Sequence, residues 1–165
     1  MPTPRDSLAA VAVDGKIYAV GGKVMRILRP GAVAIEQLPT VEVYDPETGT
    51  WTRATDMPTK RDSFAISAVN KKLYAIGGGF HEHLSVVEEY TLAADTWVRL
   101  ADMPTARGEL SASAVDGRIY VVGGDSEDRG IVSRVEVFDT GFRQPQSVNS
   151  AGKLTTMWGE IKAAR

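Results

Sequence analysis

The stretch that decides the fold is Ile17-Tyr18-Ala19-Val20-Gly21-Gly22, an apolar run that ends in two glycines. It returns as Leu73-Tyr74-Ala75-Ile76-Gly77-Gly78 and again as Ile119-Tyr120-Val121-Val122-Gly123-Gly124. Three copies of one pattern within 165 residues are typical of a repeat architecture, in which each copy is one supersecondary unit. We therefore expect a stacked array of similar units.

Two further elements keep step with the glycine pairs. A Met-Pro-Thr-x-Arg segment begins at Met1, Met57 and Met103, so the copies start 56 and then 46 residues apart. A third segment recurs as Val41-Glu42-Val43-Tyr44-Asp45, Val87-Glu88-Glu89-Tyr90-Thr91 and Val135-Glu136-Val137-Phe138-Asp139. The first copy is ten residues longer, and the whole excess lies between Gly22 and Glu42. An insertion confined to one segment predicts a loop there, within residues 23–40.

Each repeat predicts four strands. In the first, Ser7–Val13 and Lys16–Val20 flank Asp14-Gly15, which is a hairpin turn signal. Val41–Asp45 predicts a third strand and Trp51 opens a fourth after a turn. The first two strands are almost continuously apolar, which indicates burial on both faces, as when sheets stack.

These residues together resemble the kelch repeat. The resemblance rests on the glycine pair, the tyrosine after the Asp-Gly turn, the Val-Glu-x-Tyr-Asp strand and the spaced tryptophan. It implies an all-β fold, a β-propeller of four-stranded antiparallel blades, here approximately 1–56, 57–102 and 103–165 within one domain, 1–165. The repeated packing residues are then Gly21, Gly22, Gly77, Gly78, Gly123, Gly124, Tyr18, Tyr74, Tyr120, Trp51 and Trp97.

The third repeat departs from this pattern. No tryptophan follows Asp139 at the six-residue spacing that separates Asp45 from Trp51. The next tryptophan is Trp158, within Lys153–Lys162, and we expect this segment to form the fourth strand of the third blade. The alternative is a short terminal helix packed outside the array.

Three blades leave a ring unfinished, because closed propellers contain about 4–8 blades. The two end faces are built to be buried, so we expect a homodimer in which two arcs join head to tail into a six-bladed ring. Basic residues of the first inserted loop and acidic residues of the third would then be neighbours; these are Lys23, Arg26, Arg29, Asp125, Glu127 and Asp128. These charges could equally be solvated without mutual energy, and the chain could be a fragment of a longer propeller.

The composition excludes some classes of function. The chain is 43% apolar and 24% charged with a net charge of -2, so it has no electrostatic reason to bind nucleic acid. No apolar run approaches the ~18 residues that cross a bilayer, and the N-terminus has no signal-peptide pattern. The absence of cysteine excludes disulfides and thiolate chemistry. The compartment stays open, with the cytoplasm as the default.

The candidate ligand contacts lie in loops. The resemblance places the loop after each glycine pair and the segment leading into each first strand on one face, around the channel mouth. Its contacts carry over to Lys23, Gly79, Phe80 and Asp125, and to Ser7, Ser63 and Glu109, with Arg5, Arg61, Arg107 and His81 beside them. These positions vary while the framework repeats, as a recognition surface would.

Several of these residues have a second interpretation. Arg5, Arg61 and Arg107 recur with Glu42, Glu88 and Glu136, which indicates paired charges between blades or at loop anchors instead of an arginine cluster for an acidic ligand. His81-Glu82-His83 could present two imidazoles to one metal, but no third ligand is fixed and a solvated loop is the simpler interpretation.

The sequence therefore predicts a binding or scaffold module for a protein, peptide or small polar ligand, with no cofactor and no metal. It shows no nucleophile–base constellation, and without cysteine it cannot form the tyrosine–cysteine copper site of oxidases that resemble kelch propellers. The alternative is a carbohydrate-active propeller, such as a sugar epimerase or mutarotase, whose scattered residues no motif would reveal.

Overall fold

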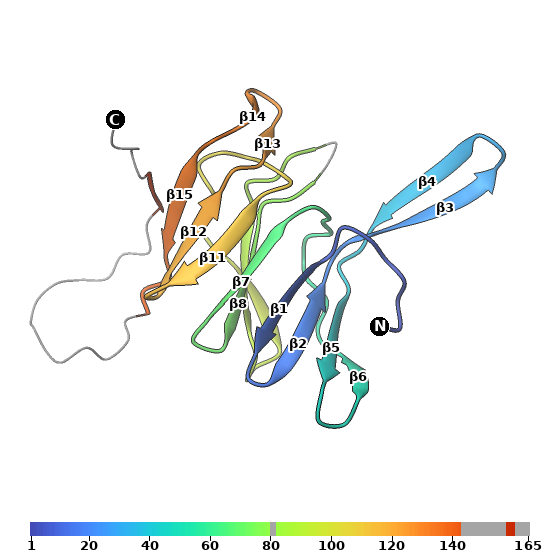
Figure 1. Cartoon of the computed structure of the whole chain (residues 1–165), viewed down its shortest axis with the longest axis horizontal. Helices are drawn as coiled ribbons and strands as arrows, with labels where there is room; N and C mark the ends of the chain where they lie inside the picture. Colours follow the sequence, from blue (N-terminus) through green and yellow to red (C-terminus); the bar gives the residue numbers. More distant parts are fainter. Residues whose placement is uncertain (80–81, 143–157, 161–165) are drawn as a thin grey trace, which may run out of the picture.

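The computed structural model describes residues 1–79 and 82–142 and the backbone of 158–160, and it contains three four-stranded antiparallel sheets. Figure 1 shows them side by side as the blades of an arc. The strands are β1 (Ala9–Val13), β2 (Lys16–Val20), β5 (Val41–Asp45) and β6 (Thr50–Arg53) in blade 1; β7 (Ala65–Val69), β8 (Lys72–Ile76), β9 (Val87–Thr91) and β10 (Thr96–Arg99) in blade 2; and β11 (Ser111–Val115), β12 (Arg118–Val122), β15 (Val135–Asp139) and β16 (Trp158–Glu160) in blade 3.

The strand register confirms the predicted fourth strand of the third blade. Trp51 lies opposite Tyr44 and Trp97 opposite Tyr90 in the outer strand pairs. In the same position of blade 3, Trp158 lies opposite Phe138. The alternative of a terminal helix at this tryptophan is therefore wrong, and the long excursion before β16 returns the chain to the same register.

The core lies at the two blade junctions, because the sheets stack face to face. Tyr18 of blade 1 packs on Tyr90 of blade 2 with ring centroids 6.2 Å apart, and Tyr74 of blade 2 packs on Phe138 of blade 3 at 6.0 Å. Buried aliphatic side chains from both neighbours fill the space around each pair. A fully buried side chain of this kind contributes about 1.5–3 kcal/mol, so the junctions hold the arc together. The prediction that these tyrosines pack between blades is confirmed.

The paired glycines are needed where one blade meets the next. Gly21 and Gly22 adopt φ values of 62° and 95°, in the left-handed region that residues with a Cβ avoid. A Cβ on Gly21 would also lie 2.7 Å from the backbone oxygen of Arg61 in blade 2. The glycine is thus required both by backbone conformation and by the close approach of the neighbouring blade.

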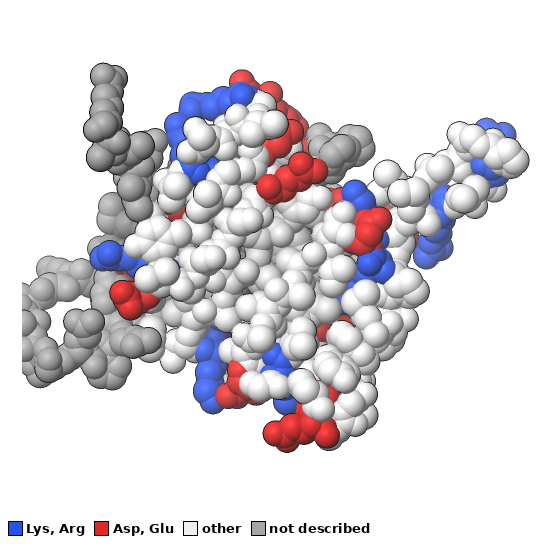
Figure 2. Space-filling model, in the orientation of Figure 1, with Lys and Arg blue, Asp and Glu red and all other residues white. Residues whose placement is uncertain are grey.

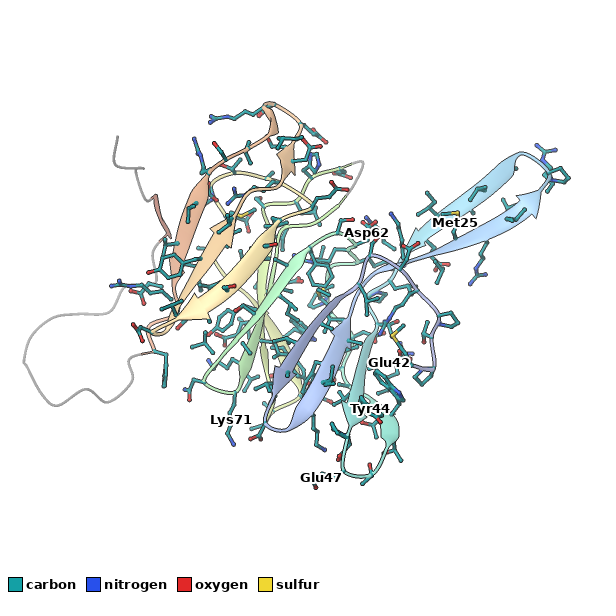
Figure 3. All side chains as sticks on the ribbon, viewed as in Figure 1. Met25, Glu42, Tyr44, Glu47, Asp62 and Lys71 are labelled. Atoms are coloured by element: carbon teal, nitrogen blue, oxygen red, sulfur yellow. The ribbon has the colours of Figure 1, made fainter. Side chains whose placement is uncertain are left out.

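The inserted segment is not a loop, which corrects the expectation for residues 23–40. It forms a hairpin of β3 (Lys23–Arg29) and β4 (Ala32–Gln37), and Figure 1 shows it projecting from blade 1, away from blades 2 and 3. Its β-branched residues favour extended backbone, and Gly31 turns the chain at a φ of 83°. Figure 2 shows Lys and Arg atoms along this arm, and Figure 3 places Met25 on it. A shorter hairpin, β13 (Asp125–Ser126) and β14 (Gly130–Ile131), occupies the equivalent place in blade 3.

The two ends of the arc expose residues whose counterparts are buried. Val20 and Ile76 are fully buried at the junctions, whereas Val122 of blade 3 is 48% exposed. In the same way Met57 and Met103 are buried, whereas Met1 is 42% exposed. The outer faces of blades 1 and 3 therefore carry the residues of a junction without a neighbouring blade.

Candidate functional site

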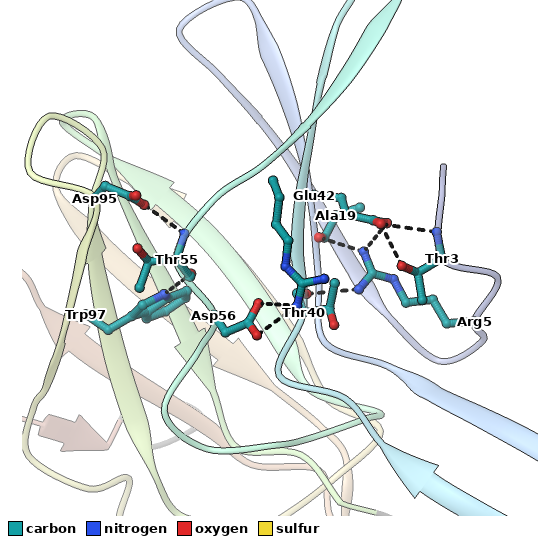
Figure 4. Close-up of polar contacts among 10 residues, drawn as sticks. Thr3, Arg5, Ala19, Thr40, Glu42, Thr55, Asp56, Asp95 and Trp97 are labelled. Atoms are coloured by element: carbon teal, nitrogen blue, oxygen red, sulfur yellow. Dashed lines mark hydrogen bonds and ion pairs between the residues drawn. The ribbon is translucent and has the colours of Figure 1, made fainter.

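The Met-Pro-Thr-x-Arg segment of each blade is anchored by a buried ion pair. In blade 2 the Arg61 guanidinium donates to the Glu88 carboxylate and to the carbonyls of Gly77 and Val86, while the Thr59 hydroxyl donates to the other Glu88 oxygen. Arg5 with Glu42 and Arg107 with Glu136 repeat this arrangement. Figure 4 shows the blade 1 version, with Thr3 and Arg5 converging on Glu42.

These arginines are structural, which corrects their placement among the ligand contacts. The side chains of Arg5, Arg61 and Arg107 are fully buried, and their partners Glu42, Glu88 and Glu136 are almost so. Burial lowers the pKa of each arginine, and the paired carboxylate opposes that shift. The pairs lie within one blade, so they tie the lead-in segment to the blade's second and third strands instead of joining two blades.

Three of the predicted contacts form an inner rim, which consists of Ser7, Ser63 and Glu109. The Ser63 amide donates to the Ser7 carbonyl at 2.9 Å, and the Glu109 amide donates to the Ser63 carbonyl at 2.7 Å. All three residues adopt left-handed φ values of 50–52°, so the same tight turn is repeated in every blade. Ser7 and Glu109 are exposed and Ser63 is half-buried. The rim thus brings one side chain from each blade to adjacent positions on a fixed backbone.

The loops after the glycine pairs are less open than the sequence predicted. Lys23 places its ammonium 3.1 Å from the Asp62 carboxylate of blade 2, which also accepts from the Gln37 amide at 2.7 Å. Gly79 is buried and donates its amide to the Asp62 carbonyl. Lys23 and Gly79 therefore serve the junction in this structure, with Lys23 keeping 16% of its side chain exposed. Figure 3 shows Asp62 near the base of the β3–β4 hairpin.

The remaining predicted contacts divide between described and undescribed residues. Asp125 is 44% exposed and lies 3.8 Å from Nε2 of His83. Phe80 and His81 lie outside the described residues. Of the residues that are described, no three His, Cys, Asp or Glu side chains are grouped so as to hold a metal ion. Nor does that part of the chain contain a helix long and apolar enough to span a bilayer.

Sequence reasoning missed Asp62, Gln37, His83 and Ser126. A signal for Asp62 was present, because the residue after the repeated arginine is aspartate in two blades, Asp6 and Asp62, and Gly108 in the third. No comparable signal marks the other three residues, because they lie on hairpins and loops whose lengths differ between the blades.

Two family models cover most of the chain. One, described as the KLHDC2/KLHL20/DRC7 Kelch-repeats domain, matches residues 1–124, and a second, the Kelch motif, matches residues 106–144. The chain belongs to the kelch-repeat family. The three sheets are accordingly kelch blades, as the resemblance in the sequence implied.

Similar kelch proteins occur in animals and plants. The chain is 33% identical to Kelch-like protein 28 of Homo sapiens over 75 residues, 46% of this chain and 13% of that protein. It is 40% identical over 74 residues to an F-box/kelch-repeat protein of Arabidopsis thaliana, covering 45% of this chain and 18% of that one. Kelch-like protein 15 of Danio rerio is 37% identical over 68 residues, 41% of this chain and 11% of that protein. The matched segment is thus a small part of each relative.

Proposed function

We propose that this kelch chain is a non-enzymatic protein-interaction module whose recognition surface is the inner rim of Ser7, Ser63 and Glu109. The observation that carries the proposal is the run of inter-blade hydrogen bonds through these residues. It fixes the backbone of three blades in one geometry while the side chains differ. Rigid scaffolds commonly place binding residues on such loops.

The rim supports binding of a peptide segment better than catalysis. Its side chains are two hydroxyls and one carboxylate, none of which has a general base or a cationic partner printed beside it in the described part of the chain. Hydroxyl and carboxylate groups are suited to accept hydrogen bonds from backbone amides or basic side chains. The buried arginines are already occupied by their glutamates, so they are not free to polarise a sugar.

We further propose that a second copy of the chain completes the ring, as a homodimer with six blades. At both junctions the second glycine of the pair donates to an arginine carbonyl of the next blade, Gly22 to Arg61 and Gly78 to Arg107. In the described residues the Gly124 amide makes no such bond, nor does the Arg5 carbonyl. The Ser7 amide and the Glu109 carbonyl are left over from the rim in the same way. A head-to-tail second copy would pair all of these groups, and it would cover Val122 and Met1.

A peptide selection tests the recognition surface. We expect a random peptide library selected on the intact protein to yield binders whose affinity falls at least roughly tenfold in Glu109→Lys, because the carboxylate is replaced by a cation. The matched control is Thr52→Arg, on the exposed outer strand β6, which should leave binding unchanged. Binders that are indifferent to Glu109→Lys would contradict the rim as the recognition surface. Conversion of free sugars by the same preparation would favour a carbohydrate-active propeller.

A further inference from the structure

A small polar cavity lies between blades 2 and 3, apart from the inner rim. Its volume is about 170 Å³, and its lining includes His83 from blade 2 together with Ser126, Glu127, Asp128 and Arg129 from the β13–β14 hairpin. Drug-sized ligands occupy pockets of roughly 300–1,000 Å³, so this cavity has room only for a small group or a single side chain.

Two buried polar atoms are unpaired in this cavity. The His83 side chain is 8% exposed and its Nδ1 atom has no hydrogen-bond partner in the structure. Ser126 is 4% exposed and its Oγ atom likewise has none. Buried polar groups are nearly always hydrogen-bonded, and leaving one unpaired costs about 1–3 kcal/mol. Two such atoms in the lining of one cavity therefore indicate a ligand group that would satisfy both.

The hydrogen-bonding character of the cavity favours a donor. The Asp125 carboxylate lies 3.8 Å from Nε2 of His83 and favours a proton on that nitrogen, which leaves Nδ1 of the neutral ring as an acceptor. The Ser126 hydroxyl can accept as well. The Thr105 hydroxyl is not available as a donor to the ligand, because it donates to Glu136.

The charges around the cavity favour a cation. Glu127 and Asp128 supply two carboxylates against the one guanidinium of Arg129, and Asp125 stands behind the imidazole. Figure 2 shows acidic and basic atoms together in the region of this hairpin. A metal ion is disfavoured, because among the described residues no group of three ligands converges.

We propose that this cavity binds the ammonium group of a lysine side chain presented by a partner protein. The ammonium donates to Nδ1 of His83 and to Oγ of Ser126, and its charge is balanced by Glu127 and Asp128. The lysine stem fills the remaining volume. The inference deepens the proposed protein-binding function by adding a second, charge-selective contact beside the inner rim.

An NMR titration of the intact ¹⁵N-labelled protein tests the cavity directly. The probes are N-acetyl-lysine methylamide and its norleucine counterpart, which has the same stem without the ammonium. We expect the lysine probe to shift the resonances of the His83 ring and the Ser126 amide, with at least roughly tenfold weaker binding of the norleucine probe. Ser126→Ala should weaken the lysine probe about tenfold, whereas Ser111→Ala, on the exposed strand β11, should not.

Several results would overturn the proposal. Equal binding of both probes would show that the cavity is merely apolar, and absence of saturable shifts would show that water alone satisfies the two atoms. Binding of N-acetyl-aspartate methylamide in preference to lysine would show that the charge assignment is reversed. Glu127→Gln offers a second variant, at an exposed residue, that should weaken only the lysine probe. Because the probes are single residues, failure here leaves the peptide selection at the rim unaffected.

Discussion

A buried arginine fixes the segment that leads into each blade. The Arg61 guanidinium binds two backbone carbonyls as well as Glu88, so one side chain joins the lead-in to the strand ends of β8 and to β9. Burial lowers the pKa of Arg61, but arginine starts so high that it stays charged, and Glu88 neutralises it. The lead-in also carries the inner rim. The geometry of the recognition surface therefore depends on a pair that no ligand reaches.

Breaking this pair should destabilise the protein strongly. Glu88→Gln removes the compensating charge and leaves the Arg61 guanidinium buried, which costs about 3–5 kcal/mol. Urea unfolding followed by tryptophan fluorescence measures the loss. The control is Asp56→Asn, which breaks the pair with Arg53, where the two side chains are 39% and 60% exposed. It should cause a much smaller change, because exposed ion pairs are screened. Equal losses in the two variants would mean that the buried pair is not the anchor.

The sequence predicted the pairing of repeated Arg and Glu but not its consequence for the site. Recurrence of Arg61 and Glu88 in every blade indicates a common structural role, yet recurrence alone does not say whether the guanidinium faces solvent or core. The candidate site was predictable only where it follows the repeat, as at Ser63. His83 and Ser126 come together because a loop of blade 2 meets a hairpin of blade 3, and spacing within one repeat contains no information about that contact.

At the scale of elements, the β3–β4 hairpin is the part of the chain that the blades do not need. None of its residues belongs to the two core clusters, and Met25, Ile27, Leu28, Val33 and Ile35 are all more than half exposed. Only its base is engaged, where Lys23 and Gln37 hold Asp62. Length alone predicted a loop here, whereas the four blade strands followed from their alternation and turns. An insertion without a counterpart in the other repeats gave no register from which to predict a hairpin.

Polar substitution of the hairpin should weaken dimerisation without destabilising the arc. The arm extends past blade 1, toward the space that blade 3 of a second copy would occupy in the proposed ring (Figure 1). Ile27→Ser with Leu28→Ser removes exposed apolar surface, 81% and 69% exposed respectively, that this contact would bury. We expect an unchanged free energy of unfolding at low protein concentration and a dissociation constant raised on the order of tenfold. The corresponding control is Thr48→Ser with Thr50→Ser, in the exposed turn of blade 1. An unchanged dissociation constant would remove the hairpin from the seam.

At the scale of the whole molecule, the arc shows on its end faces what the junctions bury. The repeat made the blades predictable, because each copy obeys the same strand register. Closure was predictable only as an expectation, since it depends on surfaces that belong to different copies. The structure sharpens it by naming groups that lack a partner, the Gly124 amide and Arg5 carbonyl on one side of the rim and the Ser7 amide and Glu109 carbonyl on the other.

Gly123→Ala separates closure from folding. In the arc a Cβ at Gly123 meets only the Val132 carbonyl at 3.8 Å, whereas one at the equivalent Gly77 would lie 2.6 Å from the Arg107 carbonyl. In a closed ring, the same clash would fall on Arg5 of a second copy. Gly15→Ala is the matched control, with a φ of 75° against 65° and no atom within 4 Å. Both variants should lose about 1–2 kcal/mol of stability from the left-handed backbone.

Only Gly123→Ala should affect assembly. Sedimentation equilibrium should show twice the mass of one chain for the wild type and for Gly15→Ala, and dissociation into single chains for Gly123→Ala at the same concentration. The buried counterpart Gly77→Ala should instead destabilise the arc itself, because its clash is internal. A wild-type protein with the mass of one chain would contradict the homodimer and would leave the end faces to blades from another source. A Gly123→Ala protein that keeps twice that mass would show that the copies meet on some other surface, because the junction geometry leaves no space for a Cβ there.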